Sequence, residues 1–202
     1  MTVLFRLACL AVLIGVASRP REVAQPPVAV QHGDVVLQTS TSSRSALIRQ
    51  VTNSPYSHVG LVEVAKDGVF VIEAVQPVSR TPFEVWRKRG QGQRITVLRA
   101  KALDTVTLRD VVSAAKKELG KPYDARYRWD DEKLYCSELV AKAFERGAKV
   151  TIGEQQQVKS LDLAPELLAL GPKLGIDLEQ TLLTPASIAK DAHFDLVHTD
   201  FP

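Results

Sequence analysis

The stretch Leu134-Tyr135-Cys136-Ser137-Glu138-Leu139-Val140 is the most informative part of this chain, because it places a cysteine where a helix is predicted to begin. The spacing of apolar residues predicts a helix that starts near Cys136, runs to Phe144 or Arg146 and stops at Gly147. Free backbone N–H groups and the positive end of the helix dipole lie at such a start, and one of these N–H groups can face an oxyanion. They stabilise a thiolate over a thiol, so the position favours a reactive cysteine over a structural one.

The number of cysteines bears on the same question. The 202-residue chain has two, Cys9 and Cys136. If the N-terminal segment that holds Cys9 is removed, Cys136 has no partner for an internal disulfide. A lone thiol outside the cytoplasm is prone to oxidation, so it is either buried as a small apolar group or used chemically. Composition alone leaves both interpretations open.

A nucleophilic thiol needs a base, and the base needs a group that orients it. Two β-rich runs, His58–Val64 and Val69–Val75, flank Asp67-Gly68 and predict a hairpin. His58 opens the first strand, and Glu73 lies near the end of the second in an apolar run, where a buried carboxylate would need a partner. Taken singly, each could instead be an ordinary polar residue of a strand. Together they are the candidate base and the candidate orienting carboxylate.

The length of the turn decides whether these two side chains meet. If Glu63 pairs with Gly68 across a four-residue loop, His58 lies directly across from Glu73, with Cβ atoms about 5 Å apart. A tight two-residue turn would instead place Glu73 opposite Val62, roughly 13 Å along the strand from His58. The sequence leaves both registers open.

Periodicity, turn residues and helix caps predict the other elements. We expect strands at 33–37, 94–98 and 194–197, and helices at 45–51, 104–119, 165–170 and 185–191. Thr105 or Thr107 is the predicted cap of the 104–119 helix, and Gly120 ends it. An antiparallel sheet with helices packed on it is an α+β fold.

The N-terminus has the pattern of a targeting segment. An apolar run at Leu7–Val16 follows a short positive region, and small residues precede a candidate cleavage site after Ala17. The run is shorter than the roughly 20 residues of a membrane span, and an uncleaved anchor is the alternative. We expect residues 1–17 to be a signal peptide or N-terminal anchor, 18–32 a flexible Pro-rich leader and 33–202 the folded domain. The protein would then be exported to the periplasm or cell envelope, with the membrane near its N-terminus.

Length and composition restrict the class of protein. A chain of 202 residues suits one domain, and its 45% hydrophobic and 24% charged residues are ordinary globular values. The net charge of +3 and the lack of a long basic run argue against a nucleic-acid partner. The densest basic cluster, Arg87-Lys88-Arg89 with Arg94 nearby, is interpreted as a solvated turn.

The sequence contains no signal for a cofactor or a metal. There is no phosphate loop and no glycine-rich dinucleotide motif. There is no Cys-x-x-Cys pair, and His32, His193 and His198 have no spacing typical of metal ligands. We therefore expect neither.

Five short strings carry a resemblance to a known family. They are Gly33-Asp34-Val35-Val36-Leu37, Ser57-His58-Val59-Gly60-Leu61, Ile72-Glu73-Ala74, Gly120-Lys121-Pro122-Tyr123-Asp124 and the Leu134–Val140 stretch. With these strings the chain resembles the permuted papain-like hydrolases of the YaeF/YiiX type, relatives of the NlpC-type cell-wall peptidases. Ordinary papain-like enzymes carry the cysteine before the histidine, whereas the histidine comes first here. The resemblance runs from about Gly33 to Val197.

The resemblance implies a circularly permuted papain-like, NlpC-type fold over residues 33–202. It implies that Cys136 is the nucleophile, His58 the base and Glu73 the orienting carboxylate. Tyr135 and Ser137, which flank the cysteine, become candidate oxyanion or substrate contacts.

The implied activity is a cysteine hydrolase that cleaves an amide bond through a thioacyl-enzyme intermediate. The amide would belong to a peptide, a peptidoglycan fragment or a lipid-like molecule. Two alternatives stay open: a lipid acyltransferase or esterase with the same triad, and a catalytically silent ligand-binding module.

Overall fold

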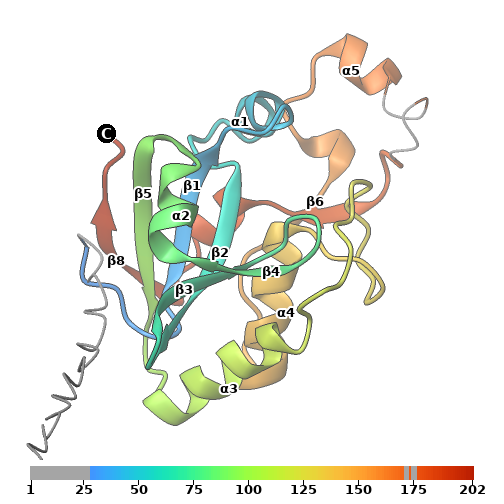
Figure 1. The fold of residues 1–202 in the computed structure, drawn as a ribbon. Helices are drawn as coiled ribbons and strands as arrows, with labels where there is room; N and C mark the ends of the chain where they lie inside the picture. Colours follow the sequence, from blue (N-terminus) through green and yellow to red (C-terminus); the bar gives the residue numbers. More distant parts are fainter. Residues whose placement is uncertain (1–27, 171–172, 174–176) are drawn as a thin grey trace, which may run out of the picture.

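The centre of the protein is a six-stranded antiparallel sheet with the strand order β4-β3-β2-β1-β5-β8 (Figure 1). The computed structural model describes residues 28–170, 173 and 177–202. The expected signal segment at 1–17 and most of the expected leader lie outside these residues. Among the described residues, no helix has both the length and the apolar character needed to cross a bilayer.

The elements have the following bounds. The sheet contains β1 (Val35–Ser40), β2 (His58–Ala65), β3 (Gly68–Glu73), β4 (Ser79–Pro82), β5 (Gly90–Ala100) and β8 (Phe194–Thr199), and a separate pair contains β6 (Gln155–Gln157) and β7 (Thr181–Leu183). The helices are α1 (Ser45–Thr52), α2 (Phe83–Lys88), α3 (Thr105–Lys116), α4 (Cys136–Ala148), α5 (Pro165–Leu170) and α6 (Pro185–Ala189), with a 3₁₀ turn at Val158–Ser160.

The α+β prediction is confirmed, and every strand or helix predicted above has a counterpart in the structure. Five short elements were not predicted: the strands β4, β6 and β7, the helix α2 and the 3₁₀ turn. The cap of α3 also differs from the prediction, because the Asp104 carboxylate accepts the N–H of Thr107 at 2.7 Å.

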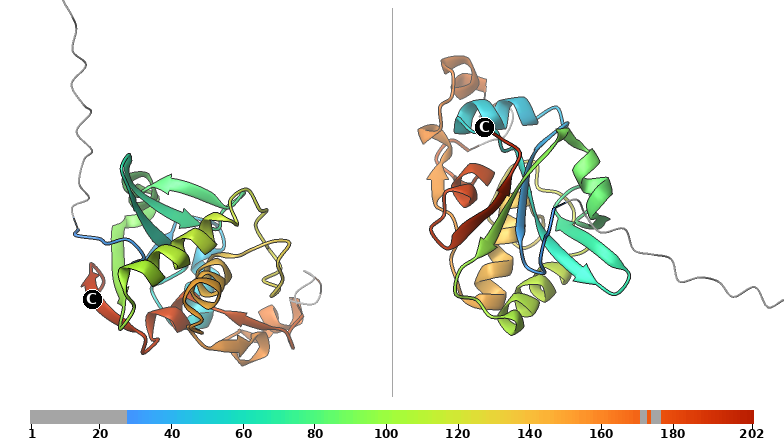
Figure 2. Two further views of the ribbon diagram at one scale, coloured as in Figure 1. Left: turned by 90° about the horizontal axis from the view of Figure 1, so that it is seen from below. Right: turned by 90° about the vertical axis from the view of Figure 1, so that its left-hand side faces the viewer.

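Alternation along the strands gives the sheet two apolar faces. Val35 and Leu37 of β1 belong to a core cluster that includes residues of α3 and α4, whereas Val36 belongs to a second cluster with Phe83 and Trp86 of α2. Figure 2 shows α2 on one side of the sheet and α3 and α4 on the other. The sheet is therefore covered on both faces, which buries its central strands. Partly buried valines at positions 28 and 30 pack against the second cluster.

Both registers offered for the β2–β3 hairpin are wrong. Leu61 pairs with Ile72 and Ala65 with Gly68, so the turn contains two residues but is shifted by one position from the predicted one. Glu73 therefore lies across from Gly60, and His58 is its diagonal neighbour on the same face. Because Gly60 has no side chain, the imidazole can reach the carboxylate across the diagonal.

The predicted stop of the cysteine helix is also wrong. Gly147 lies inside α4, which continues to Ala148 and is followed by Lys149 in the left-handed conformation at φ 58°. A Cβ atom on Gly147 would lie 2.4 Å from the backbone N and Cα of Val111 in α3. The glycine therefore permits the close crossing of the two helices and does not terminate one of them.

Replacement of this glycine tests the helix crossing. Alanine normally stabilises a helix interior by about 0.5–1 kcal/mol relative to glycine. Gly147→Ala should instead lower the free energy of unfolding by about 1–3 kcal/mol, because the new methyl group overlaps the α3 backbone. Urea denaturation measures the change, and Glu145→Ala on the exposed side of α4 serves as the control with an expected change within about 0.5 kcal/mol. A more stable Gly147→Ala variant would contradict the crossing.

Candidate active site

Cys136 is the first residue of α4, as its sequence context predicts. The thiol is nearly buried, with 5% of the residue exposed. Tyr135 precedes the helix in an extended conformation, and its carbonyl accepts the first helical hydrogen bond, from the N–H of Leu139 at 3.0 Å. The N–H groups of Cys136 and Ser137 have no acceptor one turn earlier in the helix, and they lie beside the sulfur. The position combines a thiol with backbone donors that suit an anion.

His58 is the first residue of β2, and its ring meets the last residue of β3. Its Nε2 lies 2.7 Å from Oε2 of Glu73, and the carboxylate is completely buried. Because Nε2 is engaged by Glu73, Nδ1 is the ring nitrogen left for the thiol of Cys136. The structure thus brings together the three residues singled out in the sequence, although through a register that neither prediction contained.

The three groups shift one another's protonation. Burial alone would lower the pKa of His58, but interactions with Cys136 and Glu73 outweigh it and raise this pKa to about 9. Burial likewise opposes the thiolate, yet the hydrogen bond and charge of His58 lower the pKa of Cys136 below its usual value. The two shifts belong to one coupled pair, in which thiolate and imidazolium are stabilised together near neutral pH. Burial also opposes the Glu73 anion, and its partners, His58 first, hold its pKa below the usual range.

Two residues that sequence analysis missed hold the other oxygen of Glu73. Thr81 donates its hydroxyl to Oε1 at 2.5 Å, and Arg89 donates a guanidinium N–H to the same oxygen. Arg89 is exposed and lies in a turn, as the interpretation of the 87–89 basic cluster predicts, but its guanidinium also binds a buried carboxylate. Thr81 lies in β4 and Arg89 directly after α2, and neither of these elements was predicted. Their role could not be seen because their partner is distant in the sequence.

Trp86 of α2 forms part of the wall around the imidazole. It is fully buried, and its ring centroid lies 6.4 Å from that of His58 at an interplanar angle of 33°. An indole at this distance excludes water from one side of the His58–Glu73 pair. The exclusion of water strengthens the electrostatic interaction between the two groups.

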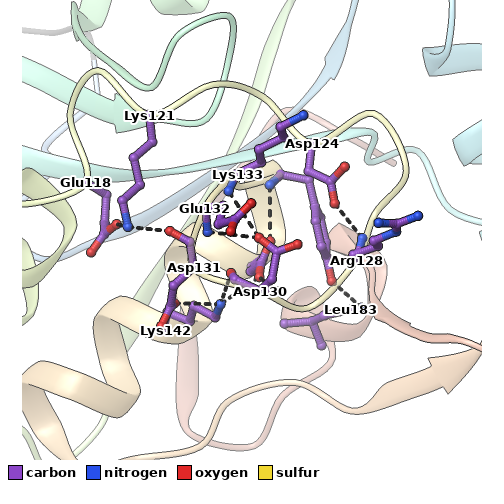
Figure 3. Close-up of polar contacts among 12 residues, drawn as sticks. Glu118, Lys121, Asp124, Arg128, Asp130, Asp131, Glu132, Lys133, Lys142 and Leu183 are labelled. Atoms are coloured by element: carbon purple, nitrogen blue, oxygen red, sulfur yellow. Dashed lines mark hydrogen bonds and ion pairs between the residues drawn. The ribbon is translucent and has the colours of Figure 1, made fainter.

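The loop that leads to α4 is held by its own carboxylates (Figure 3). Asp124 accepts the N–H of Arg128 at 2.5 Å, and Asp130 accepts the N–H of Lys133 at 3.1 Å. These contacts bend the backbone in residues 121–133 without a regular element. The chain therefore enters the helix from a defined direction.

A buried ion pair fastens this loop to α4. Oε1 of Glu138, which is fully buried, lies 2.8 Å from Nζ of Lys142 and also accepts the N–H of Asp130 at 3.0 Å. Oε2 accepts the N–H of Tyr135 at 3.4 Å, and Lys142 reaches the carboxylate of Asp131 at 2.9 Å. Burial raises the pKa of Glu138 to about 7 although Lys142 acts in the opposite direction. This pair fixes the turn that immediately precedes the cysteine.

An apolar cavity of about 510 Å³ opens beside the sulfur. Cys136 and Ser137 form part of its wall, and most of the remainder is aliphatic. The aliphatic side chains come from α1, the 3₁₀ turn and the segment after it, and β7, and they include Leu47, Ile48, Val51, Leu161, Leu163 and Leu182. A cavity of this size and lining is typical of a site for a small molecule.

A second space of about 370 Å³ lies on the side of the imidazole, and polar residues make up most of its wall. Its wall contains His58 and Arg89, together with Gln38, Ser40, Thr41 and Ser42 at the end of β1. The two spaces have Arg44, Ile48, Ser57 and Tyr123 in common. The thiol therefore faces an apolar cavity and the imidazole faces a polar groove, and the two spaces meet between them.

The two residues that flank the cysteine both line the apolar cavity. The hydroxyl of Tyr135 accepts the backbone N–H of Leu183 at 3.0 Å, so it anchors the end of β7. The hydroxyl of Ser137 lies 3.9 Å from the sulfur of Cys136, and the residue is completely buried. Tyr123 was quoted in the sequence only as part of a motif, yet it lines both the cavity and the groove.

The remaining histidines lie apart from these groups. His193 contacts Asp191 and His198 contacts Asp200, both at exposed positions, and His32 contacts the backbone of Val64. Across the part of the chain that the structure describes, no three His, Cys, Asp or Glu side chains are grouped as metal ligands would be.

Comparison with known proteins identifies a family. The family model described as permuted papain-like amidase enzyme, YaeF/YiiX, C92 family, matches residues 29–198. This match covers most of the chain and confirms the resemblance drawn from the five strings.

Two similar proteins come from Escherichia coli. The chain is 34% identical over 202 residues to the uncharacterized protein YiiX of strain K12, and the alignment covers 98% of this chain and 96% of YiiX. A crystal structure of yiiX from strain O157:H7, described as a metalloprotein, is 34% identical and superposes with a TM-score of 0.80. That superposition covers 85% of this chain and 98% of the solved one.

The coupled thiol and imidazole predict an unusual pH dependence of alkylation. A free thiol with a pKa of about 8.5 loses roughly tenfold in alkylation rate for each pH unit below that value. Iodoacetamide should instead modify Cys136 at a rate that falls much less steeply as the pH is lowered, because His58 lowers the pKa of the thiol. Mass spectrometry of the labelled peptide measures the rate.

His58→Ala should restore the steep pH dependence of a free thiol. Cys136→Ala serves as the blank that accounts for Cys9. A tenfold loss per pH unit in the unsubstituted protein would show that the thiol is not activated.

The buried carboxylate predicts a pH-dependent stability effect. Arg89→Gln should lower the free energy of unfolding by about 1–3 kcal/mol at pH 7, because a buried anion loses a charged partner. The folded-state pKa of Glu73 is lowered, so the stability that it contributes is present above the unfolded pKa of about 4.5 and is lost as the pH falls. The effect of Arg89→Gln should therefore shrink at pH 3.5. Lys88→Gln, an exposed neighbour, is the control, and an equal loss at both pH values would contradict the assignment.

Proposed function

Because the chain belongs to the YaeF/YiiX family of permuted papain-like amidases and is therefore a thiol-dependent hydrolase, we propose that Cys136 is its nucleophile, His58 its base and Glu73 the carboxylate that orients the base. The observation that carries this proposal is the single imidazole shared between a buried carboxylate and a thiol at a helix start. Such a chain of three groups is the general pattern of an activated nucleophile.

In the first half of the proposed reaction, the Cys136 thiolate attacks the carbonyl carbon of an amide. The developing oxyanion is stabilised by backbone N–H groups at the start of α4. The C–N bond then breaks, His58 gives its proton to the leaving nitrogen, and a free amine departs. The acyl group stays on the sulfur as a thioester.

In the second half, water attacks the thioester while neutral His58 accepts one of its protons. The C–S bond breaks, a carboxylic acid is released, and the thiolate–imidazolium pair is restored. Glu73 keeps the ring oriented through Nε2 and stabilises the imidazolium by its charge. Thr81 and Arg89 hold Glu73 in turn, so they are positioning residues.

A role for a bound metal has less support from the donor atoms. The yiiX structure from Escherichia coli O157:H7 is described as that of a metalloprotein. Among the described residues of this chain, Glu73 is already engaged by His58, Thr81 and Arg89, and no cluster of three ligating side chains is present. These residues do not fit a metal site, and the proposed reaction has no metal-dependent step.

We also propose that the protein is exported to the cell envelope, where kinship with the NlpC-type peptidases would place an amidase. The apolar run at residues 7–16 and the single cysteine of the folded domain support this proposal. Amino-terminal sequencing of the protein from its native cells tests it, since a chain that still begins at Met1 in the cytosolic fraction would exclude export.

The proposed mechanism predicts a covalent intermediate. Mixing with p-nitrophenyl acetate and rapid acidification should trap an acetyl group on Cys136, detected by peptide mass spectrometry. His58→Ala should slow this acylation by at least about 100-fold, because general-base catalysis is typically worth that much or more.

Cys136→Ala should yield no trapped acetyl group at this position. Acetylation of another side chain, or an equal rate in His58→Ala, would overturn the assignment. An added alcohol that diverts most of the acyl group from water would favour the alternative acyltransferase function.

A further inference from the structure

A further cavity, of about 340 Å³, lies between α3 and the segment that precedes β1. We call it the α3 groove. It shares no residue with the two spaces beside Cys136 and His58, so it is separate from the proposed catalytic groups. Its wall consists of His32, Glu63, Arg109, Val112, Ser113, Lys116 and Lys117.

The two sides of the α3 groove are set by the helix and by a close approach of the chain to it. Arg109, Ser113 and Lys116 recur at intervals of four and three residues, which places them on one side of α3. The chain before β1 packs against the same helix at Gly33, where an added Cβ atom would lie 2.8 Å from Cδ2 of Leu108. His32, the residue before this glycine, is thereby held beside α3.

Glu63 is the one carboxylate in this wall among the described residues, and its charge is already neutralised. Its Oε1 accepts Nζ of Lys116 at 2.5 Å and its Oε2 accepts Nε of Arg80 at 2.5 Å. Burial opposes the anion, but these two hydrogen bonds hold the pKa of Glu63 below its usual range. Glu63 therefore has little capacity to neutralise further cations in the groove.

Two other cations of the wall lack such a partner. In the part of the chain that the structure describes, neither Arg109 nor Lys117 forms an ion pair, and both are exposed. Asp110, which follows Arg109 in the chain, is exposed and does not line the groove. The wall therefore has an excess of positive charge, because Glu63 balances only one of its three cations.

His32 adds a hydrogen-bond donor without an acceptor. The backbone N–H of Val64 donates to Nδ1 of His32 at 3.2 Å, and in this tautomer the ring proton is on Nε2. Nε2 is buried, and no hydrogen-bond partner for it is present among the described residues. A buried donor that has lost its water is costly unless an acceptor replaces it. A ligand oxygen in the groove would supply that acceptor.

From these features we infer that the α3 groove binds a phosphate group, with the Arg109 guanidinium, the Lys117 ammonium and Nε2–H of His32 as donors. The planar fork of an arginine matches two phosphate oxygens, and a lysine adds a point charge. A phosphate has further oxygens for donors from other directions, whereas a carboxylate has only two. The same group occurs in lipid headgroups and in soluble phosphate esters. This inference is independent of the proposed function.

Calorimetric titration of the full-length protein with sn-glycerol 3-phosphate tests the site. The affinity should exceed that for glycerate, its carboxylate counterpart, at least fivefold. Arg109→Gln should weaken the binding of glycerol 3-phosphate at least tenfold, since it removes the charged fork. Arg94→Gln, an exposed arginine outside the groove, is the matched control and should stay within twofold of the unsubstituted protein.

NMR of the histidine rings shows where the ligand binds. Glycerol 3-phosphate should shift the ¹⁵N signal of His32 Nε2, which is assigned by its loss in His32→Gln. The signals of His193 and His198, which lie outside the groove, should not move. A shift at His58 without one at His32 would place the ligand at the catalytic groups and overturn the inference.

Vesicle sedimentation distinguishes a lipid headgroup from a soluble ester. Binding to phosphatidylglycerol vesicles relative to phosphatidylcholine vesicles should fall at least threefold when Arg109→Gln is combined with Lys117→Gln. The control combines Arg94→Gln with Lys88→Gln, which changes the charge equally outside the groove. The N-terminal segment is the same in all these proteins.

The two arms together decide the outcome. A vesicle preference that depends on Arg109 and Lys117 supports a lipid headgroup. An unchanged vesicle preference together with glycerol 3-phosphate binding at His32 supports a soluble ester. If Arg109→Gln alters neither vesicle binding nor the affinity for glycerol 3-phosphate, the site is overturned. The alkylation rate of Cys136 should be the same in all these variants, because the α3 groove shares no residue with the catalytic groups.

Discussion

The buried carboxylate of Glu73 is the constraint on which the site depends. A carboxylate with no exposed surface is costly unless its oxygens are paired. Three partners meet that need, the imidazole of His58 on one oxygen and the side chains of Thr81 and Arg89 on the other. The partners come from β2, from β4 and from the residue after α2, so the arrangement of these elements around β3 is tied to one charge. Any shift of these elements would leave the anion unpaired, and the orientation of the His58 ring is fixed as a consequence.

The thiol is positioned by a second, independent set of polar contacts. The Glu138–Lys142 pair inside α4 holds the preceding loop through Asp130 and Asp131. Cys136 is thereby placed at the point where the helix begins. The thiol–imidazole pair therefore forms where the start of β2, an interior strand of the sheet, meets the start of α4. Neither part needs the other for its own hydrogen bonds, but both are needed to bring the sulfur to the ring.

The two spaces beside Cys136 and His58 are lined differently because different elements form their walls. α1, the 3₁₀ turn, the segment after it and β7 supply aliphatic side chains on the side of the sulfur, whereas the end of β1 and Arg89 supply polar groups on the side of the ring. Arg44 lines both spaces.

Three results could be predicted from the sequence alone: a cysteine at a helix start, a histidine and a carboxylate on neighbouring strands, and the α+β class. They depend on caps, turns and periodicity, which are properties of short stretches of sequence. The register of the β2–β3 hairpin was decided only in the folded chain. Moving the two-residue turn by one position does not change the local preference for a hairpin, but it places Glu73 across from Gly60. Arg89 and Thr81 were also beyond the sequence, because β4 and α2 are too short for a periodic signal and a surface-like arginine gives no sign of a buried partner. The apolar cavity was likewise a tertiary result, because its wall is assembled from segments more than a hundred positions apart. The chemical type of a side chain can be read from the sequence, but the residues that surround it are determined only by long-range packing.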